Sequence, residues 1–186
     1  LGAWFGQFAH PETRGDPDVR MGWLVIIGTL PIGVLGFVFS DQIETVARNL
    51  YLVAFTLIFF GLLLGIADRT SRAIKELGQL NVPDGLIYGL CQALALIPGV
   101  SRSGATITAG LFMGYTREAA TRYAFLLAIP AVLASGFYQA LDISSDPTAA
   151  WGPTILATII AFLIGYAVIA WLIRYVSTNS YMPFVI

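Results

Sequence analysis

Pro98-Gly99-Val100-Ser101-Arg102-Ser103-Gly104-Ala105-Thr106 is a polar turn between two apolar runs, and the rest of the chain can be understood as the scaffold that places it. Arg102 is the only charged residue between Asp84 and Arg117. An arginine inside an apolar layer is costly unless an anion or carbonyl oxygens receive it. Arg102 therefore marks a candidate functional site.

Two interpretations of Arg102 are open at this point. In the first, the guanidinium binds carbonyl oxygens at neighbouring helix ends and staples a kink. In the second, it binds a ligand together with the hydroxyl groups of Ser101, Ser103 and Thr106. We favour the second interpretation, because three hydroxyl groups converge on one arginine in an apolar chain.

The composition is that of an integral membrane protein. Of the 186 residues, 57% are hydrophobic and 11% are charged, whereas soluble domains have about 25% charged residues. Mean hydropathy is +0.77. The net charge of -1 offers no basic face to a nucleic acid, so we expect no nucleic-acid partner. Cys91 is the only cysteine and is expected to pack within an apolar run.

Four uncharged apolar runs are long enough to cross the roughly 30 Å core of a bilayer as helices. They comprise residues 22–39, 50–67, 123–141 and 151–173. Prolines and charges in residues 6–21 predict a solvated loop before the first run, and Ser40 or Asp41 is expected to cap a short helix after it. Gly61 and Gly65 have the spacing of a close helix contact. That contact lies either within the chain, which we favour, or between two copies in a homodimer.

The runs on either side of the turn, residues 85–97 and 105–115, are each too short to span a bilayer at about 1.5 Å per helical residue. Pro98, two glycines and the arginine argue against one continuous helix. We predict a re-entrant helix hairpin over about residues 85–115 that enters and leaves on one side of the membrane. Two thin full crossings would leave every other loop on the same side, so that alternative stays open.

A basic loop precedes this hairpin. Arg69, Arg72 and Lys75 fall within residues 68–84, and the positive-inside rule places such a loop in the cytoplasm. A second interpretation makes these three residues a site for a lipid headgroup or phosphate. Val82-Pro83-Asp84 at the end of the loop is expected to cap the following helix.

The remaining charges agree with this orientation. Arg117 and Arg122 follow the hairpin, and Arg174 follows the last apolar run, all on the predicted cytoplasmic side. The acidic segment 142–146 contains no lysine or arginine and is predicted to lie outside. A re-entrant hairpin preserves this alternation, whereas a single crossing at 85–115 would destroy it.

The chemistry of the turn points to phosphate. Residues 104–106 are expected to open a helix, and a helix N-terminus beside an arginine and hydroxyl groups is suited to an anion. The chain has no Gly-Lys-Ser/Thr, which excludes a nucleotide-binding P-loop, and Gly99-Val100-Ser101-Arg102-Ser103 lacks the second glycine of a nucleophile elbow. No histidine follows the turn, and His10 is expected to be an ordinary loop residue. Because the acidic residues are expected to lie in surface loops, with none clustered at the depth of Arg102, we expect no metal site in this chain.

The turn resembles one family closely. Residues 93–107, Ala-Leu-Ala-Leu-Ile-Pro-Gly-Val-Ser-Arg-Ser-Gly-Ala-Thr-Ile, are similar to the second signature of the undecaprenyl-diphosphate phosphatases, the bacitracin-resistance proteins of bacterial membranes. The similarity extends to Asp84-Gly85-Leu86, to Tyr123-Ala124-Phe125-Leu126-Leu127-Ala128-Ile129-Pro130 and to Asp41-Gln42-Ile43-Glu44. It covers essentially the whole chain.

The resemblance implies removal of the terminal phosphate from undecaprenyl diphosphate in the bacterial inner (cytoplasmic) membrane, which recycles the lipid carrier for peptidoglycan synthesis and gives resistance to bacitracin. It implies that Arg102 binds and neutralises the diphosphate, with Ser101 and Thr106 as hydrogen-bonding partners. The implied substrate-binding residues are Ser103, Gly104, Gly99 and Ala105. Phosphoryl transfer needs positioned positive charge and hydrogen-bond donors, which agrees with these assignments.

The chain departs from the family pattern in one respect. The family's acidic signature, Glu-x-x-x-Glu followed by a serine-rich stretch and a histidine, is absent, so we interpret the chain as a fragment that is inactive alone. The divalent cation that the resemblance implies, Mg²⁺ or Ca²⁺, would have its ligands in the missing part. The family also resembles inverted-repeat transporters with two re-entrant hairpins. The alternative function is therefore a transporter or flippase of lipid-linked phosphates.

Overall fold

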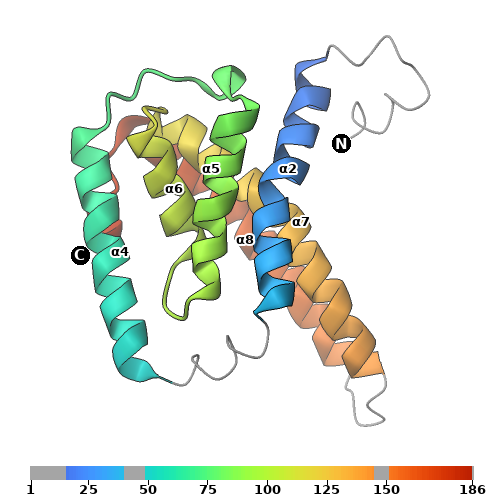
Figure 1. The fold of residues 1–186 in the computed structure, drawn as a ribbon. Coiled ribbons are helices and arrows are strands. Elements are labelled where there is room, and N and C mark those ends of the chain that lie inside the picture. The colour runs from blue at the N-terminus through green and yellow to red at the C-terminus, as the bar shows by residue number, and fades with distance from the viewer. Residues whose placement is uncertain (1–15, 40–48, 145–150, 186) are drawn as a thin grey trace.

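The computed structural model describes residues 16–39, 49–144 and 151–185, and in this part of the chain the fold is all-α (Figure 1). Four long helices are apolar enough to cross a membrane, which confirms the predicted class of multi-pass membrane protein. They are α2 (Pro17–Val38), α4 (Leu50–Thr70), α7 (Arg117–Ser144) and α8 (Trp151–Thr178). The expected cap at Ser40 or Asp41 and the loop residue His10 lie outside the described residues.

Shorter elements occupy the remaining described segments. The helices α5 (Val82–Ala93) and α6 (Arg102–Phe112) lie on either side of the turn, and η3 (Leu94–Leu96) extends α5 towards it. The single 3₁₀ turns η2 (Leu77–Gln79) and η4 (Met182–Phe184) precede the hairpin and follow α8.

The first helix begins earlier than its hydropathy predicts. The predicted loop reaches residue 21, but α2 starts at Pro17, so that prediction is wrong for the last five residues of the loop. Asp16 caps the helix, its carboxylate accepting a hydrogen bond of 2.8 Å from Asp18 N, and proline is well suited to the first helical turn. The guanidinium of Arg20 donates to Leu80 O, which ties this charged end to the loop before the hairpin.

The cap of α5 is also shifted from its predicted place. Asn81, and not Val82-Pro83-Asp84, is the N-cap, because its side-chain oxygen accepts from Asp84 N at 2.8 Å. Val82 and Pro83 form the first helical turn. Proline at this position sacrifices no helical hydrogen bond, because the first amides of a helix have no partner in any case.

The hairpin of α5 and α6 begins and ends at the same end of the molecule. Its two feet are tied together, because Ile74 N and Lys75 N donate to Gly114 O at 3.0 and 2.9 Å, and Thr116 N donates to Lys75 O at 2.9 Å. Figure 1 shows the hairpin descending between α4 and α2 and turning back, while α7 and α8 run together to one side. The geometry fits the predicted re-entrant hairpin, whose position in a membrane stays a prediction.

The tip of the hairpin is anchored on α4. The hydroxyl of Thr56 donates to Pro98 O at 2.7 Å. Thr56 lies six residues after Leu50, so the tip contacts α4 about 9 Å from that end of the helix. Gly99 has φ +88, and a side-chain carbon there would overlap Thr56 Oγ1 and the backbone of Val53, so the sharp turn requires glycine.

Glycines allow a close backbone contact between α2 and α5, but they are not the pair that the sequence suggested. A Cβ atom on Gly89 of α5 would overlap Gly28 O of α2, so these two backbones touch. Gly61 and Gly65 instead face Val185, whose Cγ1 lies 3.3 Å from the Cβ position of Gly65. The favoured intrachain contact is therefore present, although the partner is the segment after α8.

The core lies where the feet of the hairpin meet α2 and α7. Tyr88, Tyr115 and Tyr123 are almost completely buried there, with ring centroids 5.9 Å apart for Tyr88 and Tyr115 and 4.7 Å apart for Tyr88 and Tyr123. The hydroxyl of Tyr123 donates to Leu24 O at 2.8 Å. This aromatic cluster fixes the hairpin against two of the long helices.

Candidate functional site

A cavity of about 300 Å³ lies beside the hairpin tip, between α4, α6 and the segment after α8. Its polar lining comes from the start of α6, where Ser101 and Ser103 face it, and its apolar lining comes largely from α4. Four of the seven predicted site residues line it, namely Gly99, Ser101, Ser103 and Gly104. The turn singled out in the sequence is therefore the wall of a cavity.

The start of α6 presents hydrogen-bond donors at this cavity. Ser101 is the N-cap, and its hydroxyl oxygen accepts from Gly104 N at 3.2 Å and lies 3.5 Å from the hydroxyl of Ser103. The helix begins at Arg102, two residues before its predicted start. The amides of Arg102 and Ser103 make no hydrogen bond within the described part of the chain, which leaves both available to an anion.

Arg102 is half-buried at the same helical turn. Its guanidinium makes no hydrogen bond or ion pair with any residue that the structure describes. Within those residues the kink-staple interpretation therefore lacks the contacts that it needs. Arg102 is not among the residues that line the cavity, because successive residues of a helix point about 100° apart. Its side chain lies beside the cavity and not within it.

Thr106 and Ala105 are located inside the protein. Both are buried, and neither lines the cavity. The hydroxyl of Thr106 donates to Arg102 O at 2.9 Å and to Ser103 O at 3.1 Å. Its proton is thus engaged by the first turn of α6, so Thr106 supports the turn that carries Arg102.

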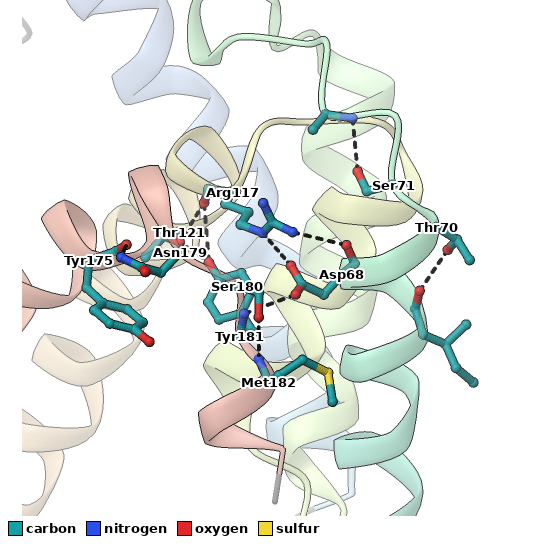
Figure 2. A network of polar contacts seen from close by, with 12 residues as sticks. Asp68, Thr70, Ser71, Arg117, Thr121, Tyr175, Asn179, Ser180, Tyr181 and Met182 are labelled. Carbon is teal, nitrogen blue, oxygen red and sulfur yellow. Dashed lines mark hydrogen bonds and ion pairs between the residues drawn. The ribbon is translucent and has the colours of Figure 1, made fainter.

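Figure 2 shows a buried polar network that the sequence did not predict. One of its members, Tyr181, lines the cavity on the side opposite the start of α6. The sequence predicts a loop from residue 68, but α4 continues to Thr70 and the Asp68 side chain is only 1% exposed. Arg117 Nε donates to Asp68 Oδ1 at 2.5 Å, and Tyr181 N donates to Asp68 Oδ2 at 3.0 Å. The hydroxyl of Tyr181 also bonds with Thr121 and donates to Arg117 O.

This network fixes two residues of the cavity wall. Tyr181 and Phe184 both line the cavity, and the network joins their segment to α4 and α7. Burial raises the pKa of Tyr181 to about 12, so its phenol is neutral at ordinary pH and its proton stays in the network. The only available sequence signal was that Asp68 directly follows an apolar run without a helix-ending residue.

A second acidic residue, Asp84, is also buried rather than at the surface. Its carboxylate accepts from the hydroxyl of Tyr115 at 2.6 Å and lies 3.4 Å from Lys75 Nζ. Burial and this hydrogen bond to Asp84 raise the pKa of Tyr115. The expectation that acidic residues lie in surface loops is therefore wrong for Asp68 and Asp84. Near the hairpin feet, Asp68 pairs with Arg117, and Asp84 pairs with Lys75 and Tyr115.

The described residues contain no cluster that fits a metal ion. Groups of three or more histidine, cysteine, aspartate or glutamate side chains do not occur among them. The two buried carboxylates are both engaged, Asp68 by Arg117 and Asp84 by Tyr115 and Lys75. The implied divalent cation thus finds no ligand set in this part of the chain.

Comparison with known proteins shows which family and which relatives this chain resembles. The family model described as "Bacitracin resistance protein BacA" matches residues 1–186. The chain is 59% identical to a Kineococcus radiotolerans protein named undecaprenyl-diphosphatase, and the match covers 100% of this chain and 66% of that protein. A Thermobifida fusca protein of the same name is also 59% identical, with 100% and 63% covered. The chain is 55% identical to a Streptomyces avermitilis protein named undecaprenyl-diphosphatase 2, with 100% and 68% covered. The chain thus spans about two thirds of the length of these relatives.

Proposed function

We propose a function for this chain from the fact that it belongs to the bacitracin resistance protein BacA family. In this proposal it forms the phosphate-binding part of an undecaprenyl-diphosphate phosphatase. The reaction is hydrolysis of undecaprenyl diphosphate to undecaprenyl phosphate and inorganic phosphate in the bacterial inner membrane. It returns the lipid carrier to peptidoglycan synthesis and so opposes bacitracin. Relatives that are 55% to 59% identical carry the name undecaprenyl-diphosphatase, which supports this assignment.

The observation that carries the proposal is the guanidinium of Arg102, which has no hydrogen-bond or ion-pair partner among the described residues, next to the start of α6. The amides of Arg102 and Ser103, which donate to no described residue, and the hydroxyls of Ser101 and Ser103 lie at the same turn. Such a group of donors matches the charge that spreads over phosphoryl oxygens during transfer. The positive end of the helix dipole adds to the attraction.

The proposed roles differ between residues of the turn. Arg102 neutralises the diphosphate, while Ser101, Ser103 and the backbone near Gly104 donate to its oxygens. Thr106 positions Arg102 and Ser103 through their carbonyl groups. Gly99 permits the turn, and Ala105 packs beneath it.

The hairpin is proposed to be re-entrant, with its feet at the cytoplasmic face. Both feet lie at the end of the molecule that carries Arg69, Arg72 and Lys75. Apolar side chains on the outside of α5, such as Leu86 and Leu90, are exposed, as contact with lipid or another apolar segment requires. This arrangement places the polar tip within the membrane, where the diphosphate of a polyprenyl lipid can reach it.

The divalent cation, Mg²⁺ or Ca²⁺, stays part of the proposal for the whole protein. The described residues offer no ligand set that fits it, so its ligands would come from other parts of the protein. None of the roles assigned above depends on the cation. A homodimer is likewise a proposal for the whole protein.

Phosphate release tests the assignment. The complete protein that contains this chain, reconstituted in lipid, is given undecaprenyl diphosphate, and inorganic phosphate is measured for the wild type and Arg102→Ala. We expect a loss of about a hundredfold or more in kcat, because a charged donor to the transferring group is removed. Arg122→Ala is the matched control, because Arg122 is exposed and pairs with Glu118 on the surface of α7.

Two outcomes would contradict the proposal. Undiminished phosphate release by Arg102→Ala would remove Arg102 from the site. Translocation of the lipid without phosphate release by the wild type would favour the alternative transporter or flippase.

A further inference from the structure

A second cavity, of about 350 Å³, lies at the feet of the hairpin and is distinct from the cavity at the tip. Its walls are the last turn of α4, the segment that follows it and the end of α6. The two cavities share no lining residue. A ligand at the feet would therefore not compete directly with a ligand at the tip.

The polar wall of this cavity carries two positive charges and no carboxylate. Arg72 and Lys75 line it, and Arg72 makes no ion pair or hydrogen bond with any described residue. Lys75 is held in place, with its Nζ 3.4 Å from Asp84 Oδ2 and 5.2 Å from the centroid of the Tyr115 ring. The hydroxyl of Ser71 accepts from Ala73 N at 3.2 Å, which leaves its proton free to donate. These groups together suit a phosphate.

The rest of the lining includes exposed apolar side chains. Phe112 lines the cavity and is 54% exposed, and Ile74 lines it and is 72% exposed. This end of the molecule is the basic, predicted cytoplasmic end of the membrane helices. A soluble phosphate makes no favourable contact with exposed apolar side chains. A lipid can pack its acyl chain against them while its headgroup binds the cations.

We infer that this cavity binds the headgroup of an anionic phospholipid, with its phosphate between Arg72 and Lys75 and its acyl chain along Phe112 and Ile74. The sequence alone allows two interpretations of the basic loop, a cytoplasmic marker or a headgroup site made of Arg69, Arg72 and Lys75. The structure separates these residues, because Arg69 does not line the cavity. The inference does not depend on the phosphatase proposal.

Lipid retention tests this inference. The complete protein is equilibrated in nanodiscs of phosphatidylcholine with a minor fraction of phosphatidylglycerol, and retained lipid is measured by native mass spectrometry after release from the disc. We expect the wild type to retain phosphatidylglycerol over phosphatidylcholine. Arg72→Gln should reduce that retention about fivefold, the effect of removing one cation near an anionic headgroup. Lys75→Gln should reduce it as well.

Arg69→Gln is the matched control, because Arg69 carries the same charge in the last turn of α4 but does not line the cavity. It should retain phosphatidylglycerol like the wild type. If Arg69→Gln and Arg72→Gln lost the same amount of phosphatidylglycerol retention, binding would depend on general surface charge and not on this cavity. That result would overturn the inference. Unchanged retention in Arg72→Gln would also overturn it. So would displacement of the lipid by millimolar inorganic phosphate, since the site would then take free phosphate. The melting temperature of each variant in pure phosphatidylcholine identifies any variant that fails to fold, and Phe112→Ser then tests the acyl wall instead.

Discussion

At the scale of single residues, the ion pair between Asp68 and Arg117 is the contact on which the cavity wall depends. The Asp68 side chain is 1% exposed and that of Arg117 is 34% exposed. Asp68→Asn leaves a partly buried guanidinium without its charge partner. We expect a loss of about 3 kcal/mol in the free energy of unfolding, the low end of the range for a broken buried pair. Denaturant unfolding in detergent, followed by circular dichroism, measures this loss.

The surface pair between Arg122 and Glu118 provides the control for that experiment. Its side chains are 51% and 42% exposed. Glu118→Gln should change the free energy of unfolding by less than about 0.5 kcal/mol, because exposed pairs one helical turn apart contribute little. If both variants lost the same stability, the Asp68 network would have no special role in holding the segment after α8.

At the scale of elements, the contact between α2 and α5 determines where the hairpin sits. Gly89→Ala would place a carbon atom against Gly28 O. This oxygen belongs to the backbone of α2, which cannot move away as a flexible side chain can. We expect a destabilisation of about 1–3 kcal/mol, typical of overpacking, visible as a lower melting temperature. Gly136→Ala is the control on α7, where a Cβ atom meets nothing within 4 Å. A loss in Gly136→Ala equal to that in Gly89→Ala would refute the close contact.

At the scale of the whole molecule, the number of times the hairpin crosses the membrane determines whether the loops before and after it lie on the same side. With Cys91→Ala as background, we expect Gly78→Cys, in η2, to be protected from an impermeant thiol reagent added outside intact cells. Asp146→Cys, in the linker between α7 and α8, should be labelled. The hairpin either returns to its side of entry or makes two thin crossings, so only α7 changes the side of the membrane between these two positions. They are therefore expected on opposite sides. Labelling of both positions from outside would exclude this alternation.

The parts of the fold that follow from average hydropathy were predictable from the sequence. Four long apolar helices and a helix–turn–helix around Pro98 need only run length and the positions of proline and glycine. Helix starts were less predictable. Asp16 and Asn81 cap their helices through single hydrogen bonds, and several neighbouring residues could have done the same.

The candidate site was predictable only in its polar tip. Ser101 and Ser103, two of the three hydroxyl residues singled out in the sequence, line the cavity. Thr106 instead turns its hydroxyl into the helix, which depends on local backbone contacts. Asp68 and Tyr181 come together across 113 residues, and no local pattern encodes such a pairing. The polar residues that line the candidate cavity were therefore visible in the sequence, whereas the residues that hold its far wall were not.

The distance along the chain between Asp68 and Tyr181 also fixes an order of assembly. A ribosome delivers α4, the hairpin and α7 to the membrane before the residues that join Asp68 from beyond α8. The hairpin can close early, because its feet pair over a short stretch of chain. The tip cavity stays open towards α8 until Tyr181 and Phe184 arrive. Completion of the pocket is thus coupled to completion of α8, so a nascent chain that stalls within α8 would present the polar tip with one wall missing.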